Sequence, residues 1–217
     1  MGIAKIHGAE YPIRKIFSND FVFRIPLYQR PYSWTTEQAG ELLDDLLDFT
    51  GQGTTAVDDL SPYFLGSVVL IKQEHLPDAE IVDGQQRLTT LTILLSALRS
   101  LLTGEYAAGL TKYLYEKGDK IEGNPNRYRL TLRDRDADFF RNHIQEDEQV
   151  EKLKALDPRQ LTDSRRNIRA NAVLFLDRLK ALSDEQLVRL AQFIAKQCLL
   201  VVVTTPDLDS AYRSFPS

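Results

Sequence analysis

The chain has 217 residues and a formal net charge of -4, from 27 Lys and Arg against 31 Asp and Glu. This acidic balance argues against a general binder of polyanions, although a local basic patch stays open. Hydrophobic residues make up 43% of the chain and charged residues 27%, which excludes an intrinsically disordered protein and fits a folded globular one.

The single cysteine, Cys198, excludes an internal disulfide and fits a reducing compartment. It opens the apolar run at residues 198–203, where a buried, reduced thiol is favoured over a reactive one. The first ten residues have no apolar core of signal-peptide length, and no stretch approaches the roughly 20 apolar residues of a membrane span. We therefore expect a cytoplasmic protein without a membrane partner.

Residues 21–25 carry apolar side chains in a β-like pattern, which predicts a short strand ending at Pro26. The nine residues that follow, Pro-Leu-Tyr-Gln-Arg-Pro-Tyr-Ser-Trp, combine three aromatic rings, one Arg and one Gln with two prolines. Because large rings are mostly buried, Tyr32 and Trp34 fit anchors to the core as well as they fit ligand contacts. Three other side chains of this loop are expected to face a ligand: Tyr28, Gln29 and Arg30.

Thr35 and Gln38 have the spacing of a capping box, and apolar residues through Phe49 predict a helix after them. The acidic residues of this helix are expected to form a solvated face rather than a metal site: Glu41, Asp44, Asp45 and Asp48. Residues 51–61 predict a mobile loop. Residues 63–71 predict a strand buried on both faces, with Gly66 where another backbone or a ligand comes close.

Two β-branched residues lead into Asp-Gly-Gln-Gln-Arg at residues 83–87, and leucines recur at helical spacing after it, so we expect a strand, a polar turn and a helix. Asp83 and Gln86 have capping-box spacing, and the free N–H groups of such a helix start suit an anion. Gly84 would let a ligand approach the backbone, and Arg87 offers donors that match phosphate. The motif therefore predicts a phosphate site. A capped helix whose Gln and Arg face water is the alternative.

The second half of the chain is predicted to be mainly helical, so the fold class is α+β. Helices are expected over residues 106–115, 134–143, 148–156, 164–182 and 184–196, the last after a capping box at Ser183 and Gln186. A short strand is expected at residues 128–132. A buried strand at residues 198–205 could join the first sheet.

Arginines concentrate in this half, interleaved with aspartates, so we expect local ion pairs rather than a DNA-facing patch. The arginines in question are Arg127, Arg129, Arg133, Arg135, Arg141, Arg165, Arg166 and Arg169. The three histidines lie far apart without partners at metal-ligand spacing, so neither a zinc site nor a histidine-metal nuclease site is expected in this chain. The sequence also has no Walker-type glycine loop and no Gly-x-Ser-x-Gly elbow.

Three motifs follow one another, at residues 23–34 (Phe-x-Ile-Pro-x-Tyr-Gln-Arg-x-Tyr-x-Trp), residues 63–67 (Tyr-Phe-Leu-Gly-Ser) and residues 81–91, which include Asp-Gly-Gln-Gln-Arg. In this order and spacing the chain resembles the bacterial domain-of-unknown-function family 262, the GmrS-like or DGQQR family. The resemblance implies a fold similar to the ParB and sulfiredoxin nucleotide-binding domains. It divides the chain into a nucleotide-binding region at 1–104, a helical region at 105–197, and a returning strand and tail at 198–217.

The resemblance implies that the domain binds and hydrolyses a nucleoside triphosphate with Mg²⁺ in a phage-defence system that cuts modified DNA. Cleavage in such systems belongs to an HNH-type nuclease domain or subunit. Family members continue beyond the point where this sequence ends, so we expect that nuclease, and part of the nucleotide site, to be absent from the chain. Association into a homo-oligomer is left open.

Carried over to this sequence, the motif assigns catalytic roles to Asp83, Gln85, Gln86 and Arg87. Arg87 would neutralise phosphate charge, Asp83 would position Mg²⁺ or the attacking water, and the two glutamines would orient phosphate or water. Gly84 would admit the triphosphate. The facing wall would consist of Tyr28, Gln29 and Arg30, with Trp34 stacking nearby or packing.

Two rival functions stay open at this point. In the first, the same pocket belongs to a non-catalytic module that senses a nucleotide or modified DNA. The second is a DNA-binding regulator of the ParB kind, which would need a recognition helix with an exposed basic face. It ranks last because the helix expected at 164–182, beyond Arg165, Arg166 and Arg169 near its start, is mainly apolar.

Overall fold

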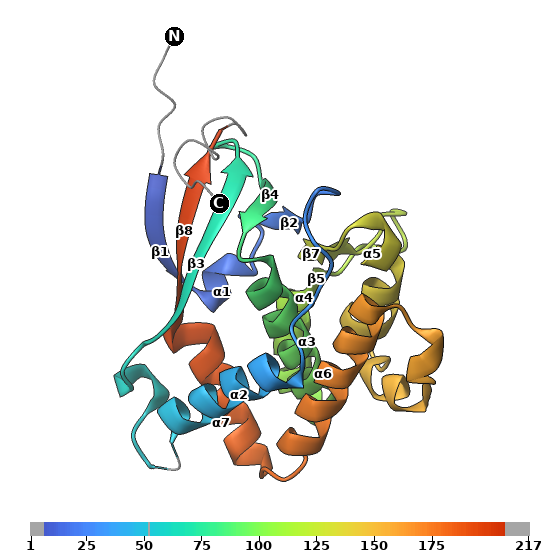
Figure 1. The fold of residues 1–217 in the computed structure, drawn as a ribbon. Helices are drawn as coiled ribbons and strands as arrows, with labels where there is room; N and C mark the ends of the chain where they lie inside the picture. The colour runs from blue at the N-terminus through green and yellow to red at the C-terminus, as the bar shows by residue number, and fades with distance from the viewer. Residues whose placement is uncertain (1–6, 52, 207–217) are drawn as a thin grey trace.

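The computed structural model describes residues 7–51 and 53–206. A mixed six-stranded sheet in the order β1-β8-β3-β4-β2-β7 occupies one end of the molecule, and the helices gather beneath and beside it (Figure 1). The strands of this sheet are β1 (His7–Pro12), β2 (Val22–Arg24), β3 (Tyr63–Lys72), β4 (Asp78–Asp83), β7 (Leu130–Thr131) and β8 (Cys198–Thr205).

The two ends of the described chain meet inside this sheet. β8 lies between β1, with which it pairs antiparallel, and β3, with which it pairs parallel. The prediction that the late strand returns to the first sheet is therefore confirmed. β1 itself was not predicted, because its six residues are exposed or only half-buried and give no alternating apolar pattern.

The helices make the fold α+β, as predicted. They are α1 (Ile13–Ile16), α2 (Thr36–Thr50), α3 (Gln85–Leu101), α4 (Gly104–Leu114), α5 (Asp134–Phe140), α6 (Asp163–Leu179) and α7 (Asp184–Gln197). Two of the three predicted capping boxes, at Thr35 with Gln38 and at Ser183 with Gln186, are present with their reciprocal bonds. None of the helices in the described part of the chain has both the length and the apolar composition needed to span a bilayer.

The helix α3 is the centre of the molecule rather than a surface helix. It packs against α4 and α6, and almost every side chain along it is buried. Three buried threonines turn their hydroxyls back onto the carbonyl four residues earlier at 2.8 Å each: Thr89, Thr90 and Thr92. Because these hydroxyls are satisfied within the helix, they do not carry the penalty of unpaired polar groups in a core.

A single hydrophobic core cluster joins residues from both halves of the chain, from Ile13 of α1 to Leu88 of α3 and Phe175 of α6. Cys198 is fully buried in it, as predicted, and burial raises the pKa of its thiol well above the ordinary value. The predicted tail beyond residue 206 lies outside the described residues.

Several predicted elements differ in form. The strand expected at 128–132 is divided between β6 (Arg127–Tyr128), which pairs with β5 (Tyr115–Glu116), and β7. The helix expected at 134–143 continues beyond α5 as a π-helix, Arg141–Gln145, and that expected at 148–156 is a 3₁₀ turn, Val150–Ala155. The left-handed backbone of Glu148 prevents a helix from starting where it was expected.

The strand β3 is not buried on both faces along its whole length, as the sequence had suggested. Phe64 is 56% exposed, because β4 pairs only with residues 69–72 and leaves the first half of β3 uncovered on that side. The loop at 51–61 contains a 3₁₀ turn, Val57–Asp59, in which the Val57 carbonyl accepts a bond from Gln197 Nε2 at 3.0 Å.

We expect Leu94→Ala to lower the free energy of unfolding by about 2–5 kcal/mol, because Leu94 is fully buried in α3 and its removal leaves a cavity. Urea denaturation would measure this, with Leu76→Ala as the matched control. Leu76 is 49% exposed, so the control should change stability by less than about 0.5 kcal/mol. Equal effects of the two substitutions would contradict the central position of α3.

Candidate functional site

The turn between β4 and α3 is built around Gly84. Its backbone is left-handed, with φ of 93°, and a Cβ added there would lie 2.5 Å from Val68 Cγ1. Only glycine fits both conditions. The expectation that Asp83 caps α3 is wrong: Gly84 is the N-cap residue and no side chain caps this helix. A left-handed residue between Asp83 and the helix separates the carboxylate from the capping position, and the side chain of Asp83 is exposed.

The guanidinium of Arg87 lies one turn into α3, half-buried and 5.9 Å from the centre of the Trp34 ring. Burial lowers the pKa of Arg87, and the charge of Asp83 and the Tyr63 hydroxyl oppose that shift. Within residues 7–51 and 53–206, no hydrogen-bond acceptor and no carboxylate within 4.0 Å is assigned to this guanidinium. Arg87 therefore contrasts with the buried Arg99, whose donors reach Asp147 and two backbone carbonyls.

Gly66 of β3 makes room for this arginine. A Cβ at Gly66 would lie 2.9 Å from Arg87 Nη1 and 3.1 Å from its Cζ, and the φ of 105° is one that few side chains tolerate. The close approach predicted at Gly66 is real, and the approaching group is the guanidinium of the chain itself. Two glycines from neighbouring strands thus shape the space around the motif.

Gln86 joins the start of α3 to the aromatic loop. Its Oε1 accepts bonds from the backbone N–H groups of Ser33 at 2.8 Å and Trp34 at 3.2 Å, and its Nε2 donates to the Pro31 carbonyl at 3.1 Å. The side chain is 6% exposed. Gln86 therefore satisfies three backbone groups of a loop that has no regular secondary structure.

Gln85 and Gln29 form a second link between the same two segments. Gln85 Nε2 donates to Gln29 Oε1 at 3.1 Å, and Gln29 Nε2 donates to the Val82 carbonyl at 2.6 Å. The Gln29 carbonyl in turn accepts from Arg133 Nη1 at 3.3 Å. The structure thus brings Gln29 of the predicted wall into contact with the motif.

The aromatic loop is anchored from below by Tyr32. Its hydroxyl lies 2.7 Å from Thr90 Oγ1 and accepts a bond from Asn171 Nδ2 at 2.7 Å. Burial raises the pKa of Tyr32 to about 12, so the hydroxyl stays protonated. Asn171 also donates to the Trp34 carbonyl at 2.9 Å. Sequence reasoning missed Asn171, since one Asn in a helical pattern gives no signal of its position.

Tyr28 and Arg30, the other two residues of the predicted wall, lie further out. The side chain of Tyr28 is 51% exposed, and that of Arg30 is exposed beside Gln85 and Arg133. Trp34 is half-buried against the core and faces Arg87. The predicted site residues therefore meet as two groups, with Arg87, Trp34 and Gly84 in one and the glutamines in the other.

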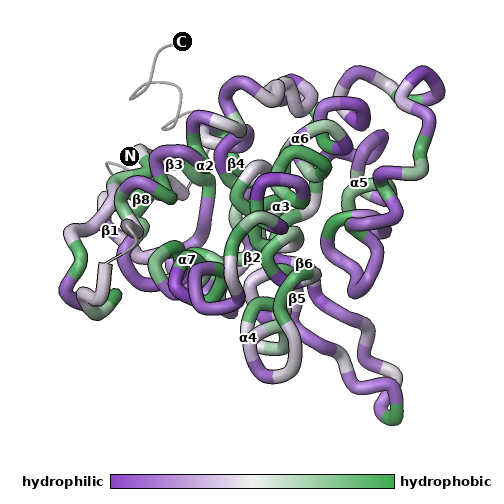
Figure 2. The backbone as a smooth tube through the Cα atoms, turned by 90° about the horizontal axis from the view of Figure 1, so that it is seen from below, coloured by the Kyte–Doolittle hydropathy of each residue, from purple (hydrophilic) through white to green (hydrophobic). Residues whose placement is uncertain are grey.

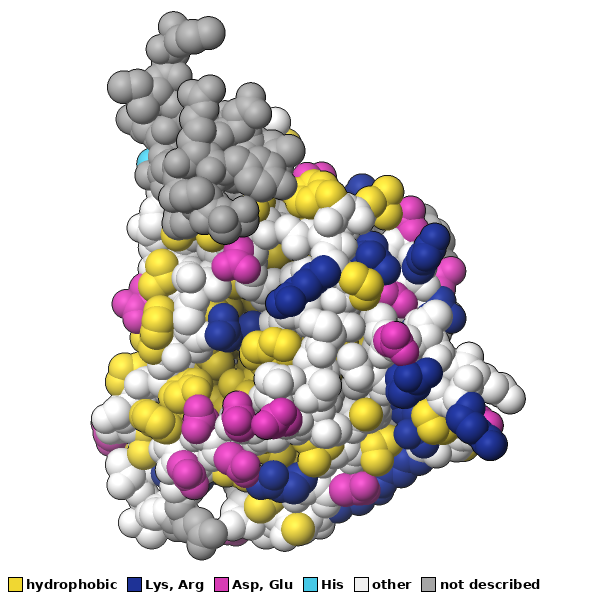
Figure 3. Space-filling view, viewed as in Figure 1, with side chains coloured by type: hydrophobic (Ala, Val, Ile, Leu, Met, Phe, Trp, Pro, Cys, Tyr) yellow, Lys and Arg dark blue, Asp and Glu magenta, His cyan; other side chains and the backbone are white. Residues whose placement is uncertain are grey.

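The surface is hollowed between the sheet and α2, with acidic side chains along the α2 rim (Figure 3). Tyr63 donates to Asp45 Oδ2 at 2.7 Å, and its ring packs edge-on to Phe49 with centroids 4.8 Å apart. The acidic residues of α2 are exposed, which confirms the predicted solvated face. Tyr63 opens the motif at residues 63–67, but no role beside Asp83 to Arg87 was predicted for it.

The arginines of the second half are held mainly by ion pairs, as predicted, and basic side chains gather over α5 and α6 (Figure 3). Arg133 and Arg165 flank the buried carboxylate of Asp136 at 3.8 and 3.6 Å. The other pairs are Arg127 and Arg129 with Glu116, Arg141 with Asp138, and Arg166 with Asp163.

The family model for the N-terminal domain of the GmrSD restriction endonuclease matches residues 13–217. The chain belongs to this family. The match covers all three motifs and nearly the whole chain, and it confirms the resemblance that the motifs indicated. A GmrSD N-terminal domain is part of a restriction system, which acts on DNA. A comparison with curated proteins found no match to this chain.

We expect Gln86→Ala to lower the free energy of unfolding by about 1–3 kcal/mol, because it leaves the N–H groups of Ser33 and Trp34 and the Pro31 carbonyl without their partner. Urea denaturation with the exposed Gln73→Ala as control would measure the effect. If both variants matched the unsubstituted protein, the link between loop and helix would carry no stability.

Proposed function

We propose that this GmrSD N-terminal domain binds a nucleoside triphosphate with Mg²⁺ at the start of α3 and hydrolyses it, and that this event regulates the restriction system. The observation that carries the proposal is the guanidinium of Arg87, which is half-buried and has neither a hydrogen bond nor an ion pair within 4.0 Å among the described residues, while the charge of Asp83 acts on it from further away. Burial of a cation is costly, and a phosphate group would supply a closer counter-charge and hydrogen-bond acceptors.

The surroundings of Arg87 suit a phosphate. The first N–H groups of α3 receive no side-chain cap, so they are free to bind an anion, and the helix dipole favours negative charge at this end. Gly66 gives the Arg87 guanidinium room to lie against β3, and Gly84 lets the turn pack closely on Val68. Trp34 holds one face of the guanidinium and limits its movement.

Asp83 is the carboxylate of the motif, and it is exposed at the end of β4 beside Arg87. In the proposal it holds Mg²⁺, directly or through water, or orients the attacking water. When bound with the nucleotide, Mg²⁺ would offset the charge that develops on the phosphate oxygens. Arg87 would stabilise the same charge from the protein side.

In the proposal the two glutamines have a structural role first and a role at the phosphate second. Gln86 has both amide atoms engaged with the loop, and Gln85 donates to Gln29, so their first role is to fix the loop that carries Trp34. That either glutamine also orients phosphate or water stays a prediction. Tyr28 and Arg30 are exposed at the outer edge and would contact the nucleotide only beyond its phosphates.

A sensor that binds without hydrolysis is the second candidate. It is favoured because Gln85 and Gln86 are hydrogen-bonded within the protein and are therefore less available to orient water. Of the three side chains, Asp83 is the one exposed for that role. Phosphate release separates the candidates: steady release from the purified chain indicates an enzyme, and saturable binding without release indicates a sensor.

We expect Arg87→Ala to weaken nucleoside triphosphate binding by about ten- to a hundredfold, because a charged hydrogen-bond partner of the phosphate is lost. Isothermal titration of each triphosphate with Mg²⁺ would measure it. Arg14→Ala, which removes an equal charge from an exposed site on α1, is the matched control and should bind as the unsubstituted chain does. Unchanged binding by folded Arg87→Ala protein would refute the assignment.

We expect Asp83→Asn to retain most of the binding but to abolish phosphate release, because an amide cannot hold Mg²⁺ or orient water as a carboxylate does. A phosphate-release assay on the unsubstituted chain and the variant, run at saturating nucleotide, would test this. Release at an equal rate from both proteins would remove Asp83 from the mechanism and leave the Arg87 site untouched.

A further inference from the structure

A cavity of about 790 Å³ opens at the end of α3 opposite to the motif. It lies between the last turn of α3, helix α4 and the segment that follows the π-helix, and it includes Arg99 and Leu102. Arg99 is about 18 Å along the helix axis from Arg87. This cavity is therefore separate from the proposed nucleotide site, and its volume is within the roughly 300–1,000 Å³ of small-molecule sites.

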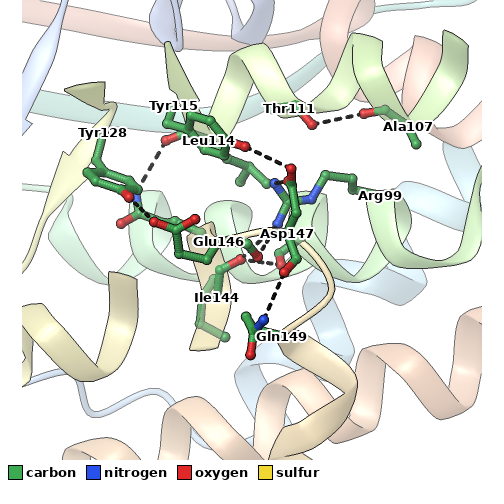
Figure 4. A network of polar contacts seen from close by, with 12 residues as sticks. Arg99, Ala107, Thr111, Leu114, Tyr115, Tyr128, Ile144, Glu146, Asp147 and Gln149 are labelled. Atoms are coloured by element: carbon green, nitrogen blue, oxygen red, sulfur yellow. Dashed lines mark hydrogen bonds and ion pairs between the residues drawn. The ribbon is translucent and has the colours of Figure 1, made fainter. Parts of the chain in front are cut away.

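One wall of the cavity is a partly buried polar network around Arg99 (Figure 4). Arg99 is 6% exposed; its Nη1 donates to Asp147 Oδ1 at 2.7 Å and its Nη2 to the Glu146 carbonyl at 2.7 Å. The Tyr115 hydroxyl donates to the other oxygen of Asp147 at 2.9 Å. The network fixes an arginine, a carboxylate and a phenol in one arrangement before any ligand arrives.

A second buried arginine of the cavity is short of one partner. Arg129 is 4% exposed and its Nε donates to the Lys112 carbonyl at 3.0 Å. Its Nη1 is buried and has no hydrogen-bond acceptor in the described chain, and the nearest carboxylate, that of Glu116, is 3.9 Å away. Buried donors are nearly always paired, so this one indicates a place for an acceptor that the chain does not supply.

The backbone beside the cavity is unusual as well. Glu148, which lines it, is the one non-glycine residue in the described part of the chain with a positive φ, of 58°. It follows closely on the π-helix Arg141–Gln145. Both conformations are uncommon and recur at functional sites, where the surrounding structure maintains them.

The lining suits a flat heterocycle that has both donors and acceptors. Ala107, Ala108 and Leu102 give an apolar surface, while arginine and carboxylate groups on the walls match acceptors and amino groups. A nucleobase has this combination. The chain belongs to a restriction family that acts on DNA. DNA is therefore the partner that would supply the nucleobase.

A loop that begins at the cavity carries an exposed apolar side chain. The loop between β5 and β6 extends away from the body of the protein and has a hydrophobic tip (Figure 2). At this tip Ile121 is 98% exposed. Asp119 Oδ1 accepts bonds from the N–H groups of Ile121 and Glu122 at 2.8 and 3.2 Å, so the tip is a defined turn. The loop begins at Lys117, which lines the cavity.

We infer that the cavity receives a nucleobase turned out of duplex DNA and that Ile121 enters the gap left in the base stack. Apolar wedges of this kind separate base steps in proteins that deform DNA, and enzymes that act on a base hold it in a pocket outside the stack. The inference rests on the proposed role of the domain in a restriction system that acts on DNA. It does not depend on the nucleotide site. The cavity would then be where the domain examines a base.

Duplex DNA with a central 2-aminopurine in a mismatched pair is the probe, because the fluorescence of this base rises when it leaves the stack. With the unsubstituted chain we expect a severalfold rise, in the presence and in the absence of nucleotide. Ala108→Trp, which fills the cavity, should abolish the rise. Ile121→Ser should reduce it at least threefold, whereas Leu76→Ser, at another exposed aliphatic residue, should leave it unchanged.

Because Ile121 is exposed, its substitution leaves the core intact, and the test stands even where Ala108→Trp fails to fold. Arg87→Ala is expected to keep the fluorescence rise, so a failure of the nucleotide site is distinguished from a failure of this inference. A rise that survives in both Ala108→Trp and Ile121→Ser would overturn the inference. So would the absence of any rise with the unsubstituted chain, whether or not DNA is bound.

Discussion

The hydrogen bonds of one buried amide hold the candidate site together. Gln86 is part of α3, the helix on which most of the core packs, yet its side chain satisfies three backbone groups of a loop more than fifty residues away in the chain. That loop has no regular secondary structure, so the backbone hydrogen bonds of a helix or sheet do not fix its position. Its position, and with it the position of Trp34 over Arg87, follows from where α3 lies.

This dependence explains why the core and the site cannot be separated in this protein. Tyr32 and Asn171 connect the same loop to the buried hydroxyl of Thr90 and to α6. Polar groups inside a core cost free energy unless each one has a partner, and here each bond also orients the loop. The apolar packing around α3 supplies the stability that allows so many polar groups to be buried at its start.

Much of this arrangement was accessible from the sequence. The motif at 83–87 predicted a strand, turn and helix, and Gly84 has the left-handed backbone that this turn requires. Capping boxes and apolar spacing located α2, α6 and α7, since these signals act within a few residues. The position of Gln86 was misjudged because capping-box spacing does not reveal a competing partner. Asn171, β1 and the contacts of Tyr63 with α2 were missed because they depend on pairing between distant segments.

The place of β8 in the sheet has a consequence for how the protein is made. β1 is synthesised before β8, its only described sheet neighbour, by almost two hundred residues. Until β8 is available, β1 and the uncovered side of β3 present open strand edges, which are sites for mispairing with other chains. The sheet of this domain should therefore be completed only after β8 has left the ribosome, and a long-range pairing of this kind is intrinsically slow.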